Sequence, residues 1–94
     1  MTAPVVRSPE GYNAMSLSAD GIVKTGEGIA YGVYVTASSS GVIRFYNNTA
    51  ASGTVILDQV SVAAQDFIPM PAEFTTGLYF DLVSGSATVT VYFV

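Results

Sequence analysis

The carboxylates are the residues of this sequence that come first as candidates for acid–base catalysis. Seven acidic residues stand singly along the chain, and Asp58 and Asp81 fall on stretches that read as strands. A glycosidase needs two carboxylates about 5–9.5 Å apart, and this pair could meet across a small sheet. A sheet with a few outward-facing acids gives the same pattern, so we expect no enzyme activity and no catalytic residue.

Other reactive groups are scarce. The chain has no histidine and no cysteine, which removes histidine-dependent catalysis and thiolate metal sites. Asp20-Gly21 and Glu27-Gly28 could offer oxygens to calcium, but Asp-Gly is a common hairpin turn. Lys24 lacks the Ser-x-x-Lys spacing of a serine nucleophile, and the glycosylation pattern at Asn47 comes without a secretory signal. We expect no metal and no cofactor.

Tyrosine is the more informative residue type. Of the six tyrosines, the strand pattern places four on outer faces: Tyr34, Tyr46, Tyr79 and Tyr92. Aromatic side chains stack on sugars or anchor protein interfaces, although plain strand preference also explains them. The absence of tryptophan weakens the sugar interpretation, so we favour a protein interface.

The elements that carry these residues are strands. Residues 28–37 alternate, with one face predicted to hold Ile29, Tyr31, Val33 and Val35. A turn is predicted at Ser38–Gly41 and a second strand at 42–47. Residues 54–60 and 77–83 continue the pattern, and Ser84–Ser86 is expected to close a hairpin onto residues 87–94. Short strands about ten residues apart, without helical periodicity, predict an all-β antiparallel domain of the β-sandwich or jelly-roll type.

Two segments have expected positions within this sheet. Residues 67–71 are apolar but interrupted by Pro69 and Pro71, which places them on a sheet edge or in a crossing loop. Residues 90–94 are free of charge and strongly β-forming, which on an exposed edge would favour aggregation. This last segment is therefore predicted to lie inside a sheet or at a subunit interface.

Size and composition bound the organisation of the chain. Its 94 residues predict one domain over residues 12–94, preceded by an extended arm, residues 1–11, with Pro4 and Pro9. Half of the residues are hydrophobic, 11% are charged and the mean hydropathy is +0.48. So much apolar surface favours self-association or docking on a larger body. The net charge of −4 argues against nucleic-acid binding. No signal peptide or spanning segment appears, so we expect a chain made in the cytoplasm and no membrane partner.

Several stretches of sequence resemble a known group. They are Lys24–Gly28, Asn47–Ile56, Phe74–Tyr79 and the alternating Ala87–Val94, and the likeness covers about residues 22–94. These stretches resemble small all-β virion proteins of tailed bacteriophages, above all head decoration (cement) proteins, which are jelly-roll-like and commonly trimeric. The resemblance implies a capsid decoration protein on the outer surface of the virion, with the major capsid protein and further copies of itself, as a homotrimer, for partners.

An alternative function is a receptor- or glycan-binding module of a phage tail fibre or spike. For the decoration hypothesis, the expected contacts with the capsid or with sister subunits lie in the arm, in the proline segment and among the outward tyrosines. They are Pro4, Val5, Val6, Pro9, Tyr34, Tyr46, Pro69, Met70, Pro71 and Tyr92.

Overall fold

The structure of the protein is a computed structural model that describes residues 5–7, by their backbone, and residues 12–94. These residues form one antiparallel sheet of seven strands without a helix, which confirms the predicted all-β class. The remainder of the predicted arm lies outside the described residues. The strands are β1 (Val5–Arg7), β2 (Asn13–Leu17), β3 (Gly21–Thr25), β4 (Gly28–Asn47), β5 (Thr54–Val62), β6 (Phe67–Phe74) and β7 (Gly77–Phe93).

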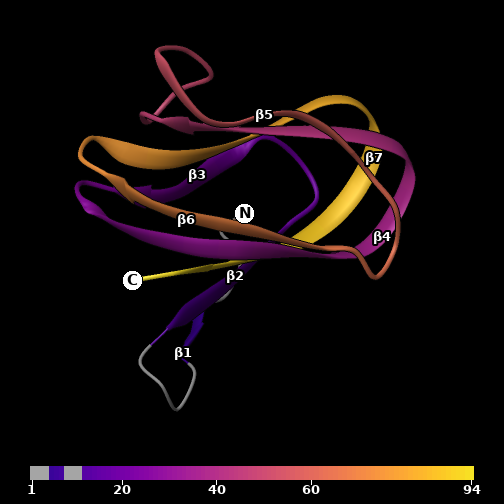
Figure 1. Ribbon diagram of the computed structural model, residues 1–94, viewed down its shortest axis with the longest axis horizontal. Helices are drawn as coiled ribbons and strands as arrows, with labels where there is room; N and C mark the ends of the chain where they lie inside the picture. Colours follow the sequence, from indigo (N-terminus) through magenta and orange to yellow (C-terminus); the bar gives the residue numbers. More distant parts are fainter. Residues whose placement is uncertain (1–4, 8–11) are drawn as a thin grey trace.

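Two very long strands form the centre of the sheet (Figure 1). β4 has 20 residues and β7 has 17, whereas strands of globular proteins usually have about 3–10. The two are antiparallel neighbours along most of their length, from the pair Ala30 and Phe93 to the pair Tyr46 and Tyr79. This pair is therefore the frame on which the shorter strands are placed.

Both long strands bend at the same level. Ser39 lies opposite Ser86, and Val42 lies opposite Ser84, with a shift of register between these two pairs. Positive φ angles at Ser40 (53°) and Gly85 (68°) turn the two backbones together. The predictions of a turn at Ser38–Gly41 and of a hairpin at Ser84–Ser86 were therefore wrong. Serine and glycine do break the straight run of each strand, but the ladder continues through the bend.

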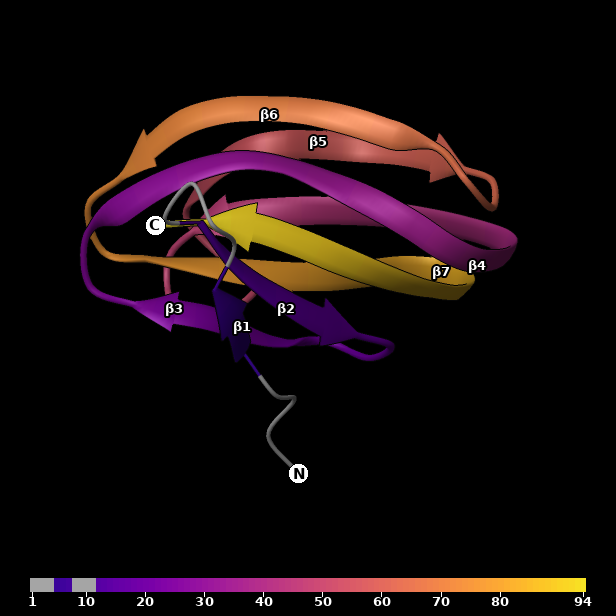
Figure 2. The same ribbon diagram turned by 90° about the horizontal axis from the view of Figure 1, so that it is seen from below.

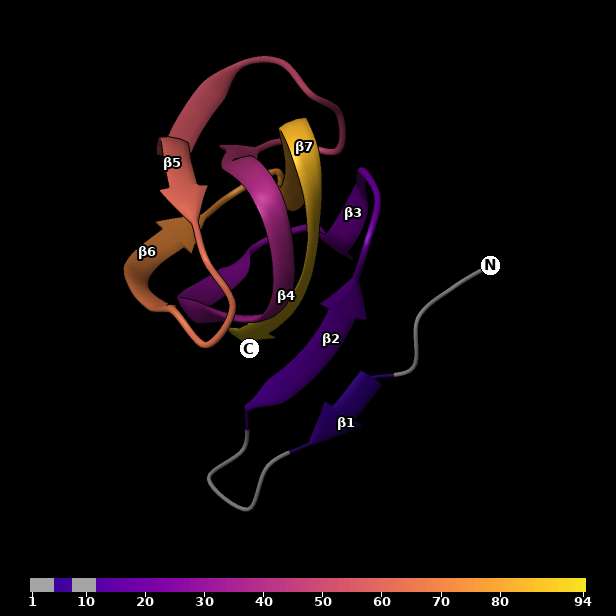
Figure 3. The same cartoon turned by 90° about the vertical axis from the view of Figure 1, so that its right-hand side faces the viewer.

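The bend divides the sheet into two halves. The edge of β4 that faces away from β7 pairs first with β6 and then with β5. The edge of β7 that faces away from β4 pairs first with β3 and then with β2. Figure 2 shows β5 and β6 on one side of the central pair and β2 and β3 on the other, and Figure 3 shows the sheet curled around its interior. Both halves contribute to one hydrophobic core, which includes Val33, Val35, Ile43, Phe45, Leu78, Phe80, Val89 and Val91.

A bulge near the start of β4 changes one predicted face. The register shifts between Ala30 and Gly32 against both neighbouring strands. As a result Ala30 is fully buried with Val33, while Ile29 is 39% exposed. The prediction that Ile29 shares a face with Val33 and Val35 was wrong, because an extra residue in a strand reverses the side on which all earlier residues point.

The two positional predictions for the sheet were correct. Within the described residues β6 pairs with β4 alone, so residues 67–71, with Pro69 and Pro71, lie on an edge strand. The end of β7 is paired with β2 on one side and with β4 on the other, and Val91 is fully buried. The part of the chain that the structure describes contains no helix of the length and apolarity that crossing a membrane requires.

Candidate functional site

One outer surface of the sheet gathers aromatic and apolar side chains across four strands. On β2, β7, β4 and β6, the residues that alternate with the buried core positions face outward in two cross-strand rows. We call this surface the aromatic face. It consists of Ala14, Tyr92, Gly32 and Pro69 in one row and of Ser16, Thr90, Tyr34 and Phe67 in the next, and it has no charged residue.

Phe67 is the most exposed large residue of this face. Its side chain is 54% exposed, yet its ring lies over the backbone of Gly32, where a Cβ atom would come within 2.5 Å of Phe67 Cζ. The ring centroid of Tyr92 is 6.4 Å away, with the two planes inclined by 48°. The missing side chain of Gly32 thus makes room for the ring. A ring already held against the sheet loses little freedom when a partner covers it.

The apolar surface continues past the Tyr92 row. Val94 follows Tyr92 on the same side of the chain, and it exchanges two backbone hydrogen bonds with Ile29, of 2.8 and 3.1 Å. Ile29 and Val94 are 39% and 40% exposed. Nearby strand ends bring Tyr12 and Tyr31 together edge to face, with centroids 4.2 Å apart. Exposed apolar side chains therefore extend from the middle of the sheet to its end, where the exposed Glu73 lies opposite Ile29.

The other half of the sheet carries charge on its outer surface. Arg44 lies opposite Asp81, and its Nε and Nη2 atoms donate hydrogen bonds of 3.2 and 3.0 Å to Asp81 Oδ2. Arg44 Nη1 is also 3.9 Å from Asp58 Oδ1. The hydrogen bond with Asp81 raises the pKa of the Arg44 guanidinium. The predicted meeting of Asp58 and Asp81 thus occurs at an arginine that contacts both.

A third acid belongs to this surface. Asp20 Oδ1 accepts a 2.7 Å hydrogen bond from the backbone N–H of Leu82, so this carboxylate fixes the loop between β2 and β3 to β7. Burial raises the pKa of Tyr79, and the charges of Asp20 and Asp81 add to the effect. We call Asp20, Arg44, Asp58 and Asp81 the charged cluster. No group of three or more potential metal-ligating acids occurs among the described residues.

The chemistry of the charged cluster is that of an ion-pair network. The guanidinium of Arg44 contacts the carboxylates of both Asp58 and Asp81. A glycosidase would direct two such carboxylates towards a sugar instead. Asp81 is 8% exposed and Asp58 is on the surface, so the two differ in their access to solvent. Arg44 also lies over the ring of Tyr46, 5.2 Å from its centroid. This geometry gives the enzyme hypothesis no support.

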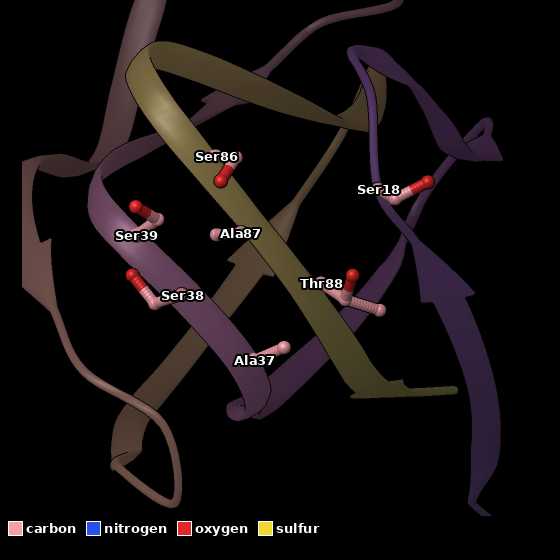
Figure 4. Close-up of a pocket in the computed structure, with 7 residues that line it drawn as sticks. All are labelled: Ser18, Ala37, Ser38, Ser39, Ser86, Ala87 and Thr88. Carbon is pink, nitrogen blue, oxygen red and sulfur yellow. The ribbon is translucent and has the colours of Figure 1, made fainter.

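A shallow depression of about 270 Å³ lies at the bend of the two long strands (Figure 4). Ser38 already uses its hydroxyl for the fold, since it donates to the carbonyl of Val62 and accepts from the N–H of Gly41. The lining offers hydroxyl groups but no aromatic or charged side chain. It consists of Ser18, Ala37, Ser38, Ser39, Ser86, Ala87 and Thr88.

The structure places the predicted contact residues unequally. Tyr34, Pro69 and Tyr92 lie together on the aromatic face, and Pro71 is exposed further along β6. Met70 is 3% exposed because it alternates with the two prolines and points into the core. It was wrongly predicted as a contact.

Tyr46 was also wrongly predicted as a contact, since it is 7% exposed beneath Arg44. The backbone of Val5 and Val6 pairs with β2 of the same chain. Their side chains, together with Pro4 and Pro9, lie outside the described residues. Sequence reasoning missed Phe67 as a member of the aromatic face. Its signal is the glycine on the facing strand, because aromatic residues often cover a glycine across a sheet, but that pairing is visible only once the register is known.

Comparison of the chain with protein-family models, with curated proteins and with solved structures found no match. Function therefore has to be inferred from the two outer surfaces. In the charged cluster, Arg44 and Asp81 bind each other, and Asp20 binds the backbone of β7, whereas the aromatic face presents rings to solvent. Of the two, the aromatic face is the surface suited to binding another molecule.

Proposed function

We propose that the chain is a structural protein of a phage virion, one that decorates the outside of the assembled head and stabilises it. The aromatic face is the observation that carries this proposal, because it is an uncharged surface of fixed rings on a well-packed sheet. The largest contiguous apolar patch on a monomeric protein, typically about 300–600 Å², is often its functional surface. The placement in a virion comes from the resemblance across residues 22–94.

The fold suits such a role. We take the folded sheet to be a small β-sandwich or jelly roll, which is supported by the two halves that share one core. A decoration protein needs a rigid scaffold and a surface that its neighbours cover, and it needs no catalytic group. Because it binds the assembled lattice of the major capsid protein and not the free subunits, it shifts the equilibrium towards the lattice by mass action.

The size of the aromatic face indicates how tightly one contact can hold. Four strands about 4.8 Å apart and about five residues in length give the face roughly 300 Å². At about 25 cal/mol per Å², full burial contributes roughly 7 kcal/mol. The loss of translational and rotational freedom on association costs about 4–15 kcal/mol, which offsets most or all of this gain. One contact is therefore weak, and attachment at many equivalent positions is what makes it stable.

Sedimentation with heads tests this function. Heads of the phage that encodes the chain, prepared without it, are mixed with the wild-type protein, with Phe67→Ser and with Ile22→Ser. Ile22 is a matched control because it is 45% exposed on β3, away from the aromatic face. We expect the wild type and Ile22→Ser to sediment with heads and Phe67→Ser to bind at least tenfold less. A wild-type protein that stays in the supernatant would exclude decoration.

A receptor- or glycan-binding module of a tail fibre or spike is the second candidate. The exposed ring of Phe67 beside Tyr92 favours it, since aromatic faces also stack on sugars. The number of copies in the virion separates the two functions. A copy number close to that of the major capsid protein supports decoration, and a much smaller number, together with binding to host surface polysaccharide, supports the fibre or spike.

A further inference from the structure

We propose that the aromatic face and the hydroxyl-lined depression beside it form one binding strip for a neutral saccharide. This inference rests on the second candidate function and deepens it, because it names the kind of glycan and the surface on which the glycan lies. The continuity of the two features, their unused hydroxyl groups and the absence of charge each support it.

The depression and the aromatic face are parts of one outer surface. Along β7, Thr88, Thr90 and Tyr92 alternate with buried core residues and therefore point to the same side of the sheet. Thr88 lies opposite Ala37 of β4, and Figure 4 shows Ser18 of β2 on the other side of it. Thr88 and Tyr92 are four positions apart, about 13 Å in an extended strand. The strip is thus long enough for a short oligosaccharide.

The strip offers hydroxyl groups that the fold does not use. Within the described part of the chain, its serine and threonine side chains on β7 and at the end of β2 take part in no hydrogen bond: Ser16, Ser18, Ser86, Thr88 and Thr90. A hydroxyl group both donates and accepts, and so do the hydroxyl groups of a sugar. A purely apolar partner would cover these groups without pairing them, which is costly. The strip therefore suits a ligand with hydroxyl groups of its own.

The rings at the other end of the strip supply a stacking surface. Phe67 is 54% exposed and is held over Gly32, and the ring of Tyr92 lies 6.4 Å from it. Aromatic rings present an apolar face, on which the C–H face of a sugar can pack. Phenylalanine and tyrosine offer less area than tryptophan, so one strip binds weakly. Many copies on one particle compensate for this weakness.

Charge selects the class of saccharide. Neither row of the aromatic face nor the lining of the depression contains a charged residue. The two basic side chains that the structure describes lie elsewhere, with Arg44 in the charged cluster and Lys24 on β3. A carboxylate or sulfate on a sugar would find no cation here, and the exposed Glu73 and the net charge of −4 would repel it. The strip is therefore matched to a neutral saccharide.

Affinity electrophoresis tests the inference with the whole chain. The negatively charged protein migrates through native gels that contain dextran, galactomannan or hydroxyethyl cellulose, which are neutral, or alginate, which is acidic. We expect at least one neutral polysaccharide to retard the wild type and alginate to have no effect. Ile22→Ser should behave like the wild type, because Ile22 lies on β3, away from the strip.

Two substitutions test whether the strip is the binding surface. Phe67→Ser should raise the polysaccharide concentration for half-maximal retardation roughly tenfold, because it removes a stacked ring. Thr88→Val removes a hydroxyl group but keeps the shape of the side chain, and it should raise that concentration about threefold. The same change would strengthen the docking of an apolar protein surface, so its direction separates the two kinds of partner. Circular dichroism checks that each variant is folded, and Thr88→Val carries the test if Phe67→Ser is not.

Three results would overturn the inference: a wild type that no neutral polysaccharide retards, equal retardation by alginate, or a Thr88→Val variant that binds as tightly as the wild type. The sedimentation experiment separates this failure from that of the proposed function. A protein that sediments with heads but is not retarded leaves decoration in place and excludes the saccharide. A protein that is retarded but does not sediment with heads excludes decoration and leaves the saccharide in place.

Discussion

The two outer surfaces of this sheet are built on the same two strands, yet they differ in how their side chains are satisfied. At the charged cluster, Arg44 contacts Asp81 and Asp58, and Asp20 is bound to the backbone of β7. At the aromatic face, the ring of Phe67 rests on Gly32 and remains 54% exposed. Polar groups that bind each other inside one chain have little to offer a partner, whereas exposed rings gain from being covered.

This difference teaches that charge is a poor guide to the binding surface here. Asp58 and Asp81 are the pair that a glycosidase hypothesis would use, and in the structure Asp81 binds Arg44 across β4 and β7 while Asp58 makes only a weak surface contact. The apolar side chains, whose abundance in the composition favoured self-association or docking on a larger body, supply the uncharged accessible surface. Six substitutions, in three pairs, test how far the two surfaces depend on the shared strands and on their own contacts.

The largest effect is expected from a charge placed beneath the aromatic face. Val91 is fully buried in β7 between β2 and β4, so Val91→Asp would bury an unpaired carboxylate. Such a burial costs several kcal/mol, comparable with the whole stability of about 5–15 kcal/mol of a small domain. We expect no folded, soluble protein, as measured by expression and circular dichroism.

Thr90→Asp is the matched control on the same strand. Thr90 points to the opposite side, onto the aromatic face, where the new carboxylate stays in water. This variant should therefore fold and remain soluble. A soluble, fully assembled Val91→Asp protein would contradict the placement of β7 at the centre of the sheet.

A smaller effect is expected at the bend that separates the two surfaces. In Gly85→Ala, the new Cβ would collide with the carbonyl of Ser40, at a residue whose φ is +68°. Positive φ costs about 1–2 kcal/mol for alanine, and the collision should bring the loss to about 3 kcal/mol, within the usual range for strained substitutions. Urea unfolding measures this loss.

Gly26→Ala separates the two causes of that loss. Gly26 has a φ of +91°, but nothing lies within 4 Å of its new Cβ. It should therefore lose only about 1 kcal/mol, the cost of the backbone angle. Equal losses for the two variants would mean that the strands can open at the bend.

The smallest effects are expected in the charged cluster. Arg44→Met keeps most of the side chain's volume but leaves Asp81, which is 8% exposed, without its donor. A poorly solvated group that loses its partner costs about 1–3 kcal/mol. Asp58→Asn should cost less than about 0.5 kcal/mol, because its surface contact with Arg44, at 3.9 Å, is weak. Urea unfolding should show this order.

Much of the fold was predictable from local sequence, and its bend was not. Alternation identified the strands, and the prolines identified the edge at β6. The bend depends on Ser40 and Gly85 meeting across two strands that are 45 positions apart at that point, which no local pattern reveals. Serine and glycine therefore predicted two turns where the structure has one continuous ladder.

The candidate site was predictable in part for the same reason. Tyr34, Tyr92 and Pro69 follow from strand alternation alone, and they do lie together. Met70 and Tyr46 failed because one points inward between two prolines and the other lies beneath Arg44. Phe67 was missed because its position over Gly32 depends on the register between β6 and β4.

The pairing of the two long strands also has a kinetic consequence. β7 is the neighbour of β2, β3 and β4, and its contacts join Ala30 to Phe93 and Tyr46 to Tyr79. A chain emerging from the ribosome holds β2, β3 and β4 for some time without the strand that joins them. Sheets dominated by such distant contacts fold in milliseconds to seconds rather than microseconds. The bend ties both halves to the same strands, so the pairing of both halves has to wait for β7.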